Sequence, residues 1–128
     1  MRADEITLTL PRDRDFYEIA HLVLGGLAAR LDLTVDQLDD LQVALDTVLE
    51  QHGADVELTV AVRVDEGELQ TFVGPFPGGN LRAALEREDD GEQLSMRRLL
   101  GAVCDRVEVE DRGGEEWIGL TKAYEVVV

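Results

Sequence analysis

The feature that most constrains the fold is the order in which strand-like and helix-like patterns follow one another along the chain. One alternating, β-prone segment comes first and two segments with helical periodicity follow. Two pairs of strand-like segments then flank a region rich in glycine and proline. Strand pairs and helix pairs are thus segregated, which is typical of α+β proteins. We therefore expect an antiparallel or mixed sheet covered on one face by helices, that is, a two-layer α+β sandwich.

Local signals predict where these elements begin and end. Pro11 ends the first strand, Thr34 is expected to cap the second long helix, and Gly53 is expected to stop it. In chain order we expect a strand at 5–10, a helix at 13–31, a helix from Thr34 to Gly53, strands at 55–64 and 69–73, a loop at 74–80, a short helix at 80–88, a helix in the first part of 95–107, and strands at 107–111 and 116–126.

Apolar residues at helical spacing predict the buried faces of the two long helices. For the first helix we expect burial of Phe16, Ile19, Val23, Leu27 and Leu31. For the second helix we expect burial of Leu38, Leu41, Leu45, Val48 and Leu49. The first helix also contains Gly25 and Gly26, and small residues inside a helix often mark close packing of another element.

Composition limits the broad class of protein. The chain has 128 residues, which predicts a single domain covering 1–128, and its net charge of −16 argues against binding nucleic acid through phosphates. No apolar run reaches the length of a membrane span, and the first twenty residues lack the apolar core of a signal peptide. The single cysteine, Cys104, is expected to be a small core residue rather than a nucleophile. We therefore expect a cytoplasmic protein with no metal site.

A long stretch without positive charge is the most unusual part of the charge pattern. Between Arg30 and Arg63 there is no lysine or arginine, whereas eight acidic residues occur. Such a stretch can be a solvated face that aids solubility, or a docking surface for a basic protein partner. For the docking interpretation the candidate contact residues are His21, Asp36, Asp39, Asp40, Asp46 and Glu50.

Three stretches resemble a known family. ITLTLPRDRDFYEIAHLVLGGLAARLDLTVDQLDDLQVAL (6–45), DRVEV (105–109) and LTKAY (120–124) are similar to the GHKL ATPase fold, in particular to anti-sigma-factor serine kinases of the bacterial stress-response and sporulation type. The resemblance covers almost the whole chain and implies the histidine-kinase-like ATPase fold. It also implies that three sequence boxes would build a Mg-nucleotide site.

The first box of that family is a glutamate followed four residues later by an asparagine on one helix face. The glutamate acts as general base or positions water, and the asparagine completes magnesium coordination. Aligned through DLQVAL, these positions fall on Thr47 and Gln51. A threonine hydroxyl is no base near neutral pH, so the geometry of the box survives while its chemistry is lost.

The other two boxes also depart from the family pattern. The aspartate that recognises adenine falls near Gly74 or Pro75, and no carboxylate lies between Glu68 and Glu86. Leu94 and Met96 stand where glycines of the phosphate-binding lid are needed for close backbone approach. The remaining candidates for contact with a nucleotide are Arg97, beside Arg98, and Thr121, which we expect to face the helices.

The resemblance and the altered boxes together predict a regulator of the anti-sigma type that acts by protein–protein binding, without a cofactor, ATP hydrolysis or kinase activity. A sigma factor or an anti-anti-sigma factor is the implied partner, and a homodimer is implied because the family dimerises. The alternative is a divergent ATP-binding serine/threonine-protein kinase that uses ATP and magnesium through Thr47, Gln51, Arg97 and Thr121. A third interpretation is a scaffold that binds a partner unrelated to transcription.

Overall fold

The computed structural model describes residues 4–11, 14–50, 57–87 and 95–125. Their element order is the predicted one: a strand, two long helices, a hairpin, two shorter helices and a final hairpin. The elements are β1 (Asp4–Leu10), the 3-10 helix η1 (Arg14–Phe16), α1 (Tyr17–Arg30), α2 (Val35–Leu49), β2 (Leu58–Asp65), β3 (Glu68–Pro77), α3 (Asn80–Glu86), α4 (Met96–Val103), β4 (Arg106–Arg112) and β5 (Glu115–Ala123).

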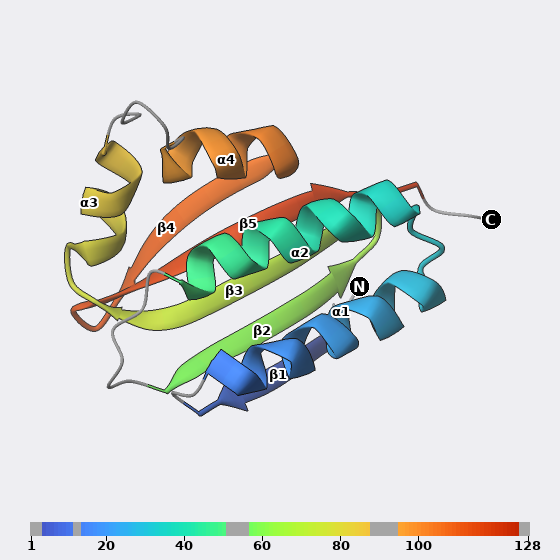
Figure 1. Cartoon of the computed structure of the whole chain (residues 1–128), viewed down its shortest axis with the longest axis horizontal. Helices are drawn as coiled ribbons and strands as arrows, with labels where there is room; N and C mark the ends of the chain where they lie inside the picture. The colour runs from blue at the N-terminus through green and yellow to red at the C-terminus, as the bar shows by residue number, and fades with distance from the viewer. Residues whose placement is uncertain (1–3, 12–13, 51–56, 88–94, 126–128) are drawn as a thin grey trace.

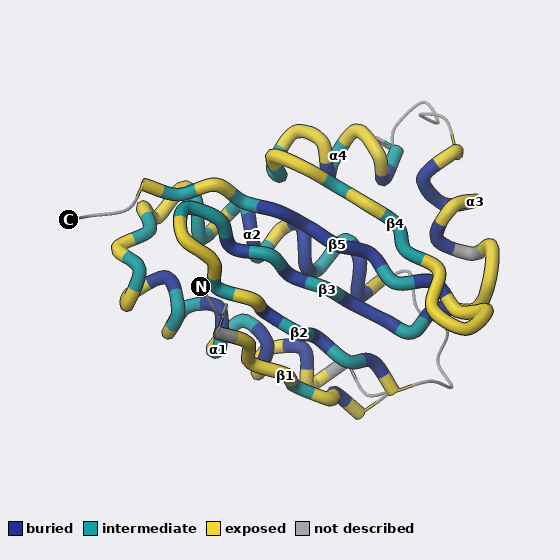
Figure 2. Tube along the Cα trace, turned by 180° about the vertical axis from the view of Figure 1, so that it is seen from behind, coloured by how far each residue is buried: buried dark blue, intermediate teal, exposed yellow. Residues whose placement is uncertain are grey.

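The strands form one antiparallel sheet in the order β1-β2-β3-β5-β4. All four described helices lie on the same face of this sheet, as Figure 1 shows, while the view from behind in Figure 2 shows the strands with no described helix over them. This arrangement confirms the predicted two-layer α+β sandwich. The core lies between the two layers, where leucine and valine side chains of the sheet meet those of α1, α2 and α4.

The second long helix follows its sequence signals closely. The Thr34 hydroxyl accepts a hydrogen bond from the Gln37 backbone N–H at 3.1 Å, and the Gln37 side chain accepts one from the Thr34 N–H at 2.9 Å. This capping box satisfies two helix-terminal donors at once and confirms Thr34 as the N-cap. The helix ends at Leu49, and Gly53 lies outside the described residues. Its buried residues are Leu41, Ala44, Leu45, Val48 and Leu49, which confirms the predicted stripe except for Leu38, which is half-buried.

The predicted buried face of the first helix is wrong in part. Phe16 and Ile19 are each 39% exposed, whereas Leu27 and Leu31 are half-buried against the core, as is expected of that face, and Val23 is half-buried. The buried positions of α1 are Tyr17, Ala20, Leu24 and Ala28. Because α1 is apolar on nearly every side, its periodicity does not distinguish the face that meets the sheet from the face that meets water.

The expected close packing at the glycine pair of α1 is not present among the described residues. A Cβ atom added at Gly25 or Gly26 would meet nothing within 4 Å. Both glycines therefore lie on a part of α1 that no other described element touches closely.

The predicted loop at 74–80 is largely strand. β3 continues to Pro77, and a shift of register between Val73 and Phe76 takes up the intervening glycine and proline. At this point the Trp117 ring of β5 lies over Gly74, so close that an added Cβ would clash with it. The glycine is therefore a packing requirement of the sheet rather than a loop signal.

Candidate functional site

The face of α2 that would carry the first nucleotide box does not present catalytic groups. Thr47 is half-buried, and its hydroxyl donates a hydrogen bond to the Val43 backbone carbonyl at 2.7 Å. A hydrogen bond from a threonine hydroxyl to a carbonyl of the preceding turn is common within helices, and here it engages the only polar proton of the side chain. The second residue of the box, Gln51, lies outside the described residues.

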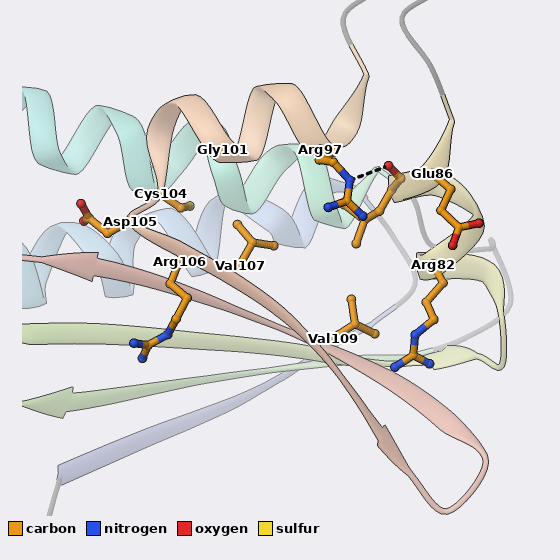
Figure 3. A pocket seen from close by; sticks show the side chains of 10 residues that line it. Arg82, Glu86, Arg97, Gly101, Cys104, Asp105, Arg106, Val107 and Val109 are labelled. Carbon is orange, nitrogen blue, oxygen red and sulfur yellow. Dashed lines mark hydrogen bonds between the residues drawn. The ribbon is translucent and has the colours of Figure 1, made fainter.

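Arg97 lies on α4, whereas Thr47 lies on α2. Its Nε–H donates a hydrogen bond to the Leu85 backbone carbonyl of α3 at 3.2 Å. The side chain lines a cavity of about 490 Å³ between α3, α4 and β4, drawn in Figure 3. No residue of α2 lines this cavity. Although α4 packs against α2, the Arg97 side chain thus lies in a cavity to which α2 contributes no residue.

The prediction that Thr121 faces the helices is wrong. Leu120 belongs to the core, and the Lys122 ammonium contacts Asp40 of α2, so these two neighbours of Thr121 occupy the helical side of β5. Side chains alternate along a strand, which places Thr121 on the opposite face of the sheet, where it is buried beside its cross-strand partners Gln70 and Arg106.

The three described candidates for contact with a nucleotide do not converge on one site. Thr47 is bonded to its own helix, Arg97 lines a cavity away from α2, and Thr121 lies on the far face of the sheet. Within the ranges that the structure describes, no group of three or more histidine, cysteine or acidic side chains could hold a metal ion. Likewise, no described helix combines the length and the apolar character needed to cross a membrane.

Some of the candidate docking residues join different elements of the fold. His21 of α1 and Asp46 of α2 lie 2.6 Å apart, between Nε2 and Oδ1, so this pair links the two long helices. The Lys122 ammonium lies 3.0 Å from Asp40 Oδ2 and 3.0 Å from the Val103 carbonyl, so it links α2, α4 and β5. These residues have a structural role whether or not a partner also contacts them.

The remaining acidic candidates lie at the surface among exposed apolar side chains. Asp36 and Asp39 are exposed on α2, and Glu50 is exposed at its C-cap. On the same helical layer, which Figure 1 shows with α1 and α2 side by side, Leu22 is 74% exposed and Val35 is 75% exposed. We define the α1–α2 outer surface by its exposed residues Ile19, Leu22, Val35, Asp36, Asp39 and Val43.

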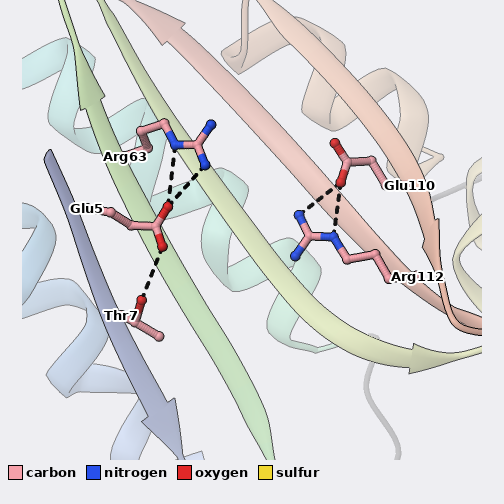
Figure 4. A network of polar contacts seen from close by, with 5 residues as sticks. All are labelled: Glu5, Thr7, Arg63, Glu110 and Arg112. Carbon is pink, nitrogen blue, oxygen red and sulfur yellow. Dashed lines mark hydrogen bonds and ion pairs between the residues drawn. The ribbon is translucent and has the colours of Figure 1, made fainter. Parts of the chain in front are cut away.

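The uncovered face of the sheet has a different character. Figure 4 shows two ion pairs on it, Arg63 with Glu5 and Arg112 with Glu110, at 3.2 Å and 2.9 Å. The Arg112 guanidinium also lies over the Trp117 ring, 4.6 Å from its centroid. Basic and acidic side chains alternate here, so this face carries no concentrated charge of one sign.

Glu116 is a structurally important residue that sequence reasoning missed. The residue is only 1% exposed. Its carboxylate accepts hydrogen bonds from the Leu81 backbone N–H at 2.9 Å and from Arg82 Nη1 at 3.2 Å. It thereby caps the first turn of α3, whose N-cap residue Gly79 has no side chain to do so. The available signal was a glutamate at an inward-facing position of a strand, two residues before Ile118.

Comparisons with known proteins agree with this fold. No protein-family profile matches the chain. It is 27% identical over 109 residues to a Listeria monocytogenes protein described as the serine-protein kinase RsbW, a match that covers 77% of this chain and 69% of that protein. The crystal structure of the RsbU and RsbW domains of Rv1364c from Mycobacterium tuberculosis superposes with a TM-score of 0.67 and 15% identity, over 94% of this chain and 32% of that one.

These matches confirm the resemblance predicted from the sequence. The chain shares its fold with the solved structure of the RsbU and RsbW domains. In sequence the chain is homologous to the serine-protein kinase RsbW. It spans about a third of the solved two-domain chain with which it shares its fold.

Proposed function

We propose that this protein is an anti-sigma-type regulator that acts by binding other proteins and transfers no phosphoryl group. The observation that carries the proposal is the state of Thr47. A kinase of this class needs a carboxylate at that point of α2, and here a hydroxyl donates its proton to the backbone of its own helix. The scattered positions of Arg97 and Thr121 support the same conclusion, because neither can complete a site around Thr47.

The α1–α2 outer surface is the docking face in this proposal. It combines exposed apolar side chains, among them Leu22 and Val35, with the carboxylates of Asp36 and Asp39. An interface of this kind suits a partner with an apolar patch surrounded by basic residues, because opposite charges steer association while apolar burial supplies affinity. Sigma factors carry basic DNA-binding surfaces, and the homology to RsbW supports a sigma factor or an anti-anti-sigma factor as the partner.

The test is a calorimetric titration of the protein with each sigma factor and anti-anti-sigma factor of the source genome, with and without Mg-ATP. We expect one of them to bind with the same Kd in both conditions. The double variant Asp36→Asn/Asp39→Asn should bind at least tenfold more weakly. The matched control Glu108→Gln/Glu115→Gln also removes two exposed charges, but from the β4–β5 hairpin, and should change Kd less than twofold.

Two results would count against the proposal. Binding that requires Mg-ATP, or phosphate transfer to the partner, would favour the kinase alternative. Equal weakening by both double variants would mean that net charge, rather than the α1–α2 outer surface, governs binding. The predicted homodimer stays a prediction, and sedimentation of the free protein measures it directly.

A further inference from the structure

We propose that the cavity between α3, α4 and β4 binds a small amphipathic carboxylate, that is, an acid with one anionic head and an apolar body. At about 490 Å³, the cavity lies within the range of small-molecule sites, roughly 300–1,000 Å³. Its lining comes from three elements that are far apart in the sequence, and all of the lining residues are described. It is distinct from the α1–α2 outer surface, and of the candidates for contact with a nucleotide it includes Arg97.

Arg97 supplies the binding site for the anionic head. Its Nε–H is engaged by the Leu85 carbonyl, which fixes the guanidinium in the orientation that Figure 3 shows, reaching from α4 toward Val107 and Val109. Its two terminal nitrogens, Nη1 and Nη2, have no acceptor among the residues that the structure describes. A guanidinium held in this way offers paired N–H donors that match the two oxygens of a carboxylate.

The other two arginines of the lining are already neutralised by acids of the chain. Arg82 Nη1 lies 2.9 Å from Asp111 Oδ1, and Arg106 Nε lies 2.9 Å from Glu108 Oε1. The hydrogen bond and charge of Asp111 raise the pKa of Arg82 further above its ordinary value. Among the residues that the structure describes, Arg97 is therefore the lining arginine without an acidic partner, which points to a ligand with a single anionic group.

The two acids of the lining do not neutralise Arg97. Asp105 accepts a hydrogen bond from the Ala123 backbone N–H at 2.7 Å, and this holds its carboxylate against β5. Glu86 acts electrostatically on Arg82, raising the pKa of that side chain. Neither carboxylate has a hydrogen bond or ion pair with the Arg97 guanidinium.

The rest of the lining suits an apolar body. Val107 and Val109 project from β4 on one side, and Leu85 and Gly101 line the cavity from α3 and α4. Cys104 also faces it and remains a neutral thiol, because burial raises its pKa to about 11. An acid with a short hydrocarbon chain can therefore place its head at Arg97 and cover these apolar side chains, whereas inorganic phosphate would leave them in contact with water.

The test uses octanoate as the probe, with inorganic phosphate and octanol as probes that carry only the charge or only the chain. Binding to the full chain is followed by the chemical shifts of backbone amides in NMR titrations. We expect octanoate to bind with a Kd on the order of 1 mM, as befits a ligand of this size, and to perturb α4 and β4. Phosphate and octanol should each bind at least tenfold more weakly.

Two variants and two matched controls locate the site. Arg97→Gln removes the head group site, and Gly101→Leu fills the cavity at a helical position where an added Cβ meets nothing within 4 Å, so the fold should tolerate it. Each should weaken octanoate binding at least tenfold. Arg98→Gln and Ala102→Leu alter the adjacent residues of α4, neither of which lines the cavity, and should change Kd less than twofold.

Each other outcome overturns the proposal. Equal binding of phosphate and octanoate would make the cavity a simple anion site. Binding of octanoate that survives both Arg97→Gln and Gly101→Leu would place the ligand elsewhere, and absence of binding by all three probes would remove the site altogether.

Discussion

Replacement of Glu116 by alanine tests how β5 and α3 are held together. In the wild type the Leu81 backbone N–H donates a hydrogen bond to Glu116 Oε1 at 2.9 Å. The substitution removes this acceptor and leaves the N–H buried and unsatisfied. An unsatisfied buried donor costs about 1–3 kcal/mol, and the small cavity left by truncation adds about 1 kcal/mol. We therefore expect Glu116→Ala to lower the free energy of unfolding by about 2–4 kcal/mol, measured by urea denaturation followed by circular dichroism.

A glutamine variant separates the hydrogen bond from the charge. Glu116→Gln keeps an oxygen that can accept from the Leu81 N–H and loses only the charge that faces Arg82, an exposed side chain that retains Asp111 as its partner. It should cost less than half as much as the alanine variant. Glu115→Ala removes the exposed neighbouring carboxylate and should change stability by less than about 0.5 kcal/mol. Equal losses for Glu116→Gln and Glu116→Ala would refute the capping argument.

Three further predictions concern other parts of the molecule. Gly74→Ala forces the Trp117 ring out of its place on β3 and should cost about 1–3 kcal/mol, with a red shift of the single tryptophan's fluorescence. Because burial raises the pKa of Cys104 from 9.0 to about 11, the unfolded thiol ionises first as pH rises. Unfolding free energy should therefore fall between about pH 9 and pH 11, and less so in Cys104→Ala. A double-mutant cycle on His21 and Asp46, side chains 30% and 49% exposed, should give a coupling below about 1 kcal/mol in urea denaturation at pH 7.

Each of these has a result that would contradict it. Unchanged fluorescence in Gly74→Ala would mean that the ring does not lie on the glycine. The same pH slope in wild type and Cys104→Ala would remove the thiol from the account of alkaline stability. A coupling of about 3 kcal/mol between His21 and Asp46 would show a pair far better shielded from water than its exposure indicates.

The sequence predicts the fold well where local signals and tertiary packing agree. The capping box at Thr34 and the leucine stripe of α2 are both local, and both are present in the structure. In α1 the local signal is ambiguous because apolar residues surround the helix, and only packing against α2 and the sheet selects Leu24 over Ile19. The strand predicted at 69–73 is shorter than β3 for a related reason. Its glycine–proline pair is locally typical of a turn, but in the sheet a register shift accommodates it.

The sequence predicts which helix or strand carries each candidate site residue, but it does not predict which groups these side chains contact. The altered identity of Thr47 can be seen in the sequence, whereas the acceptor of its hydroxyl depends on the helix it occupies. Thr121 was assigned to the wrong face, because the direction of a strand's alternation depends on its register with its neighbours. The cavity beside Arg97 could not be predicted at all, since it arises where α3, α4 and β4 meet.

Titration of the pure protein with Mg-ATP and Mg-ADP by calorimetry, up to millimolar nucleotide, tests the central claim most directly. The RsbW kinase of Listeria monocytogenes serves as the positive control. We expect no heat of binding and no rise in Tm for this protein, because Thr47, Arg97 and Thr121 do not converge on one site. Micromolar binding of Mg-ATP would contradict the account and make the protein a nucleotide-dependent kinase candidate.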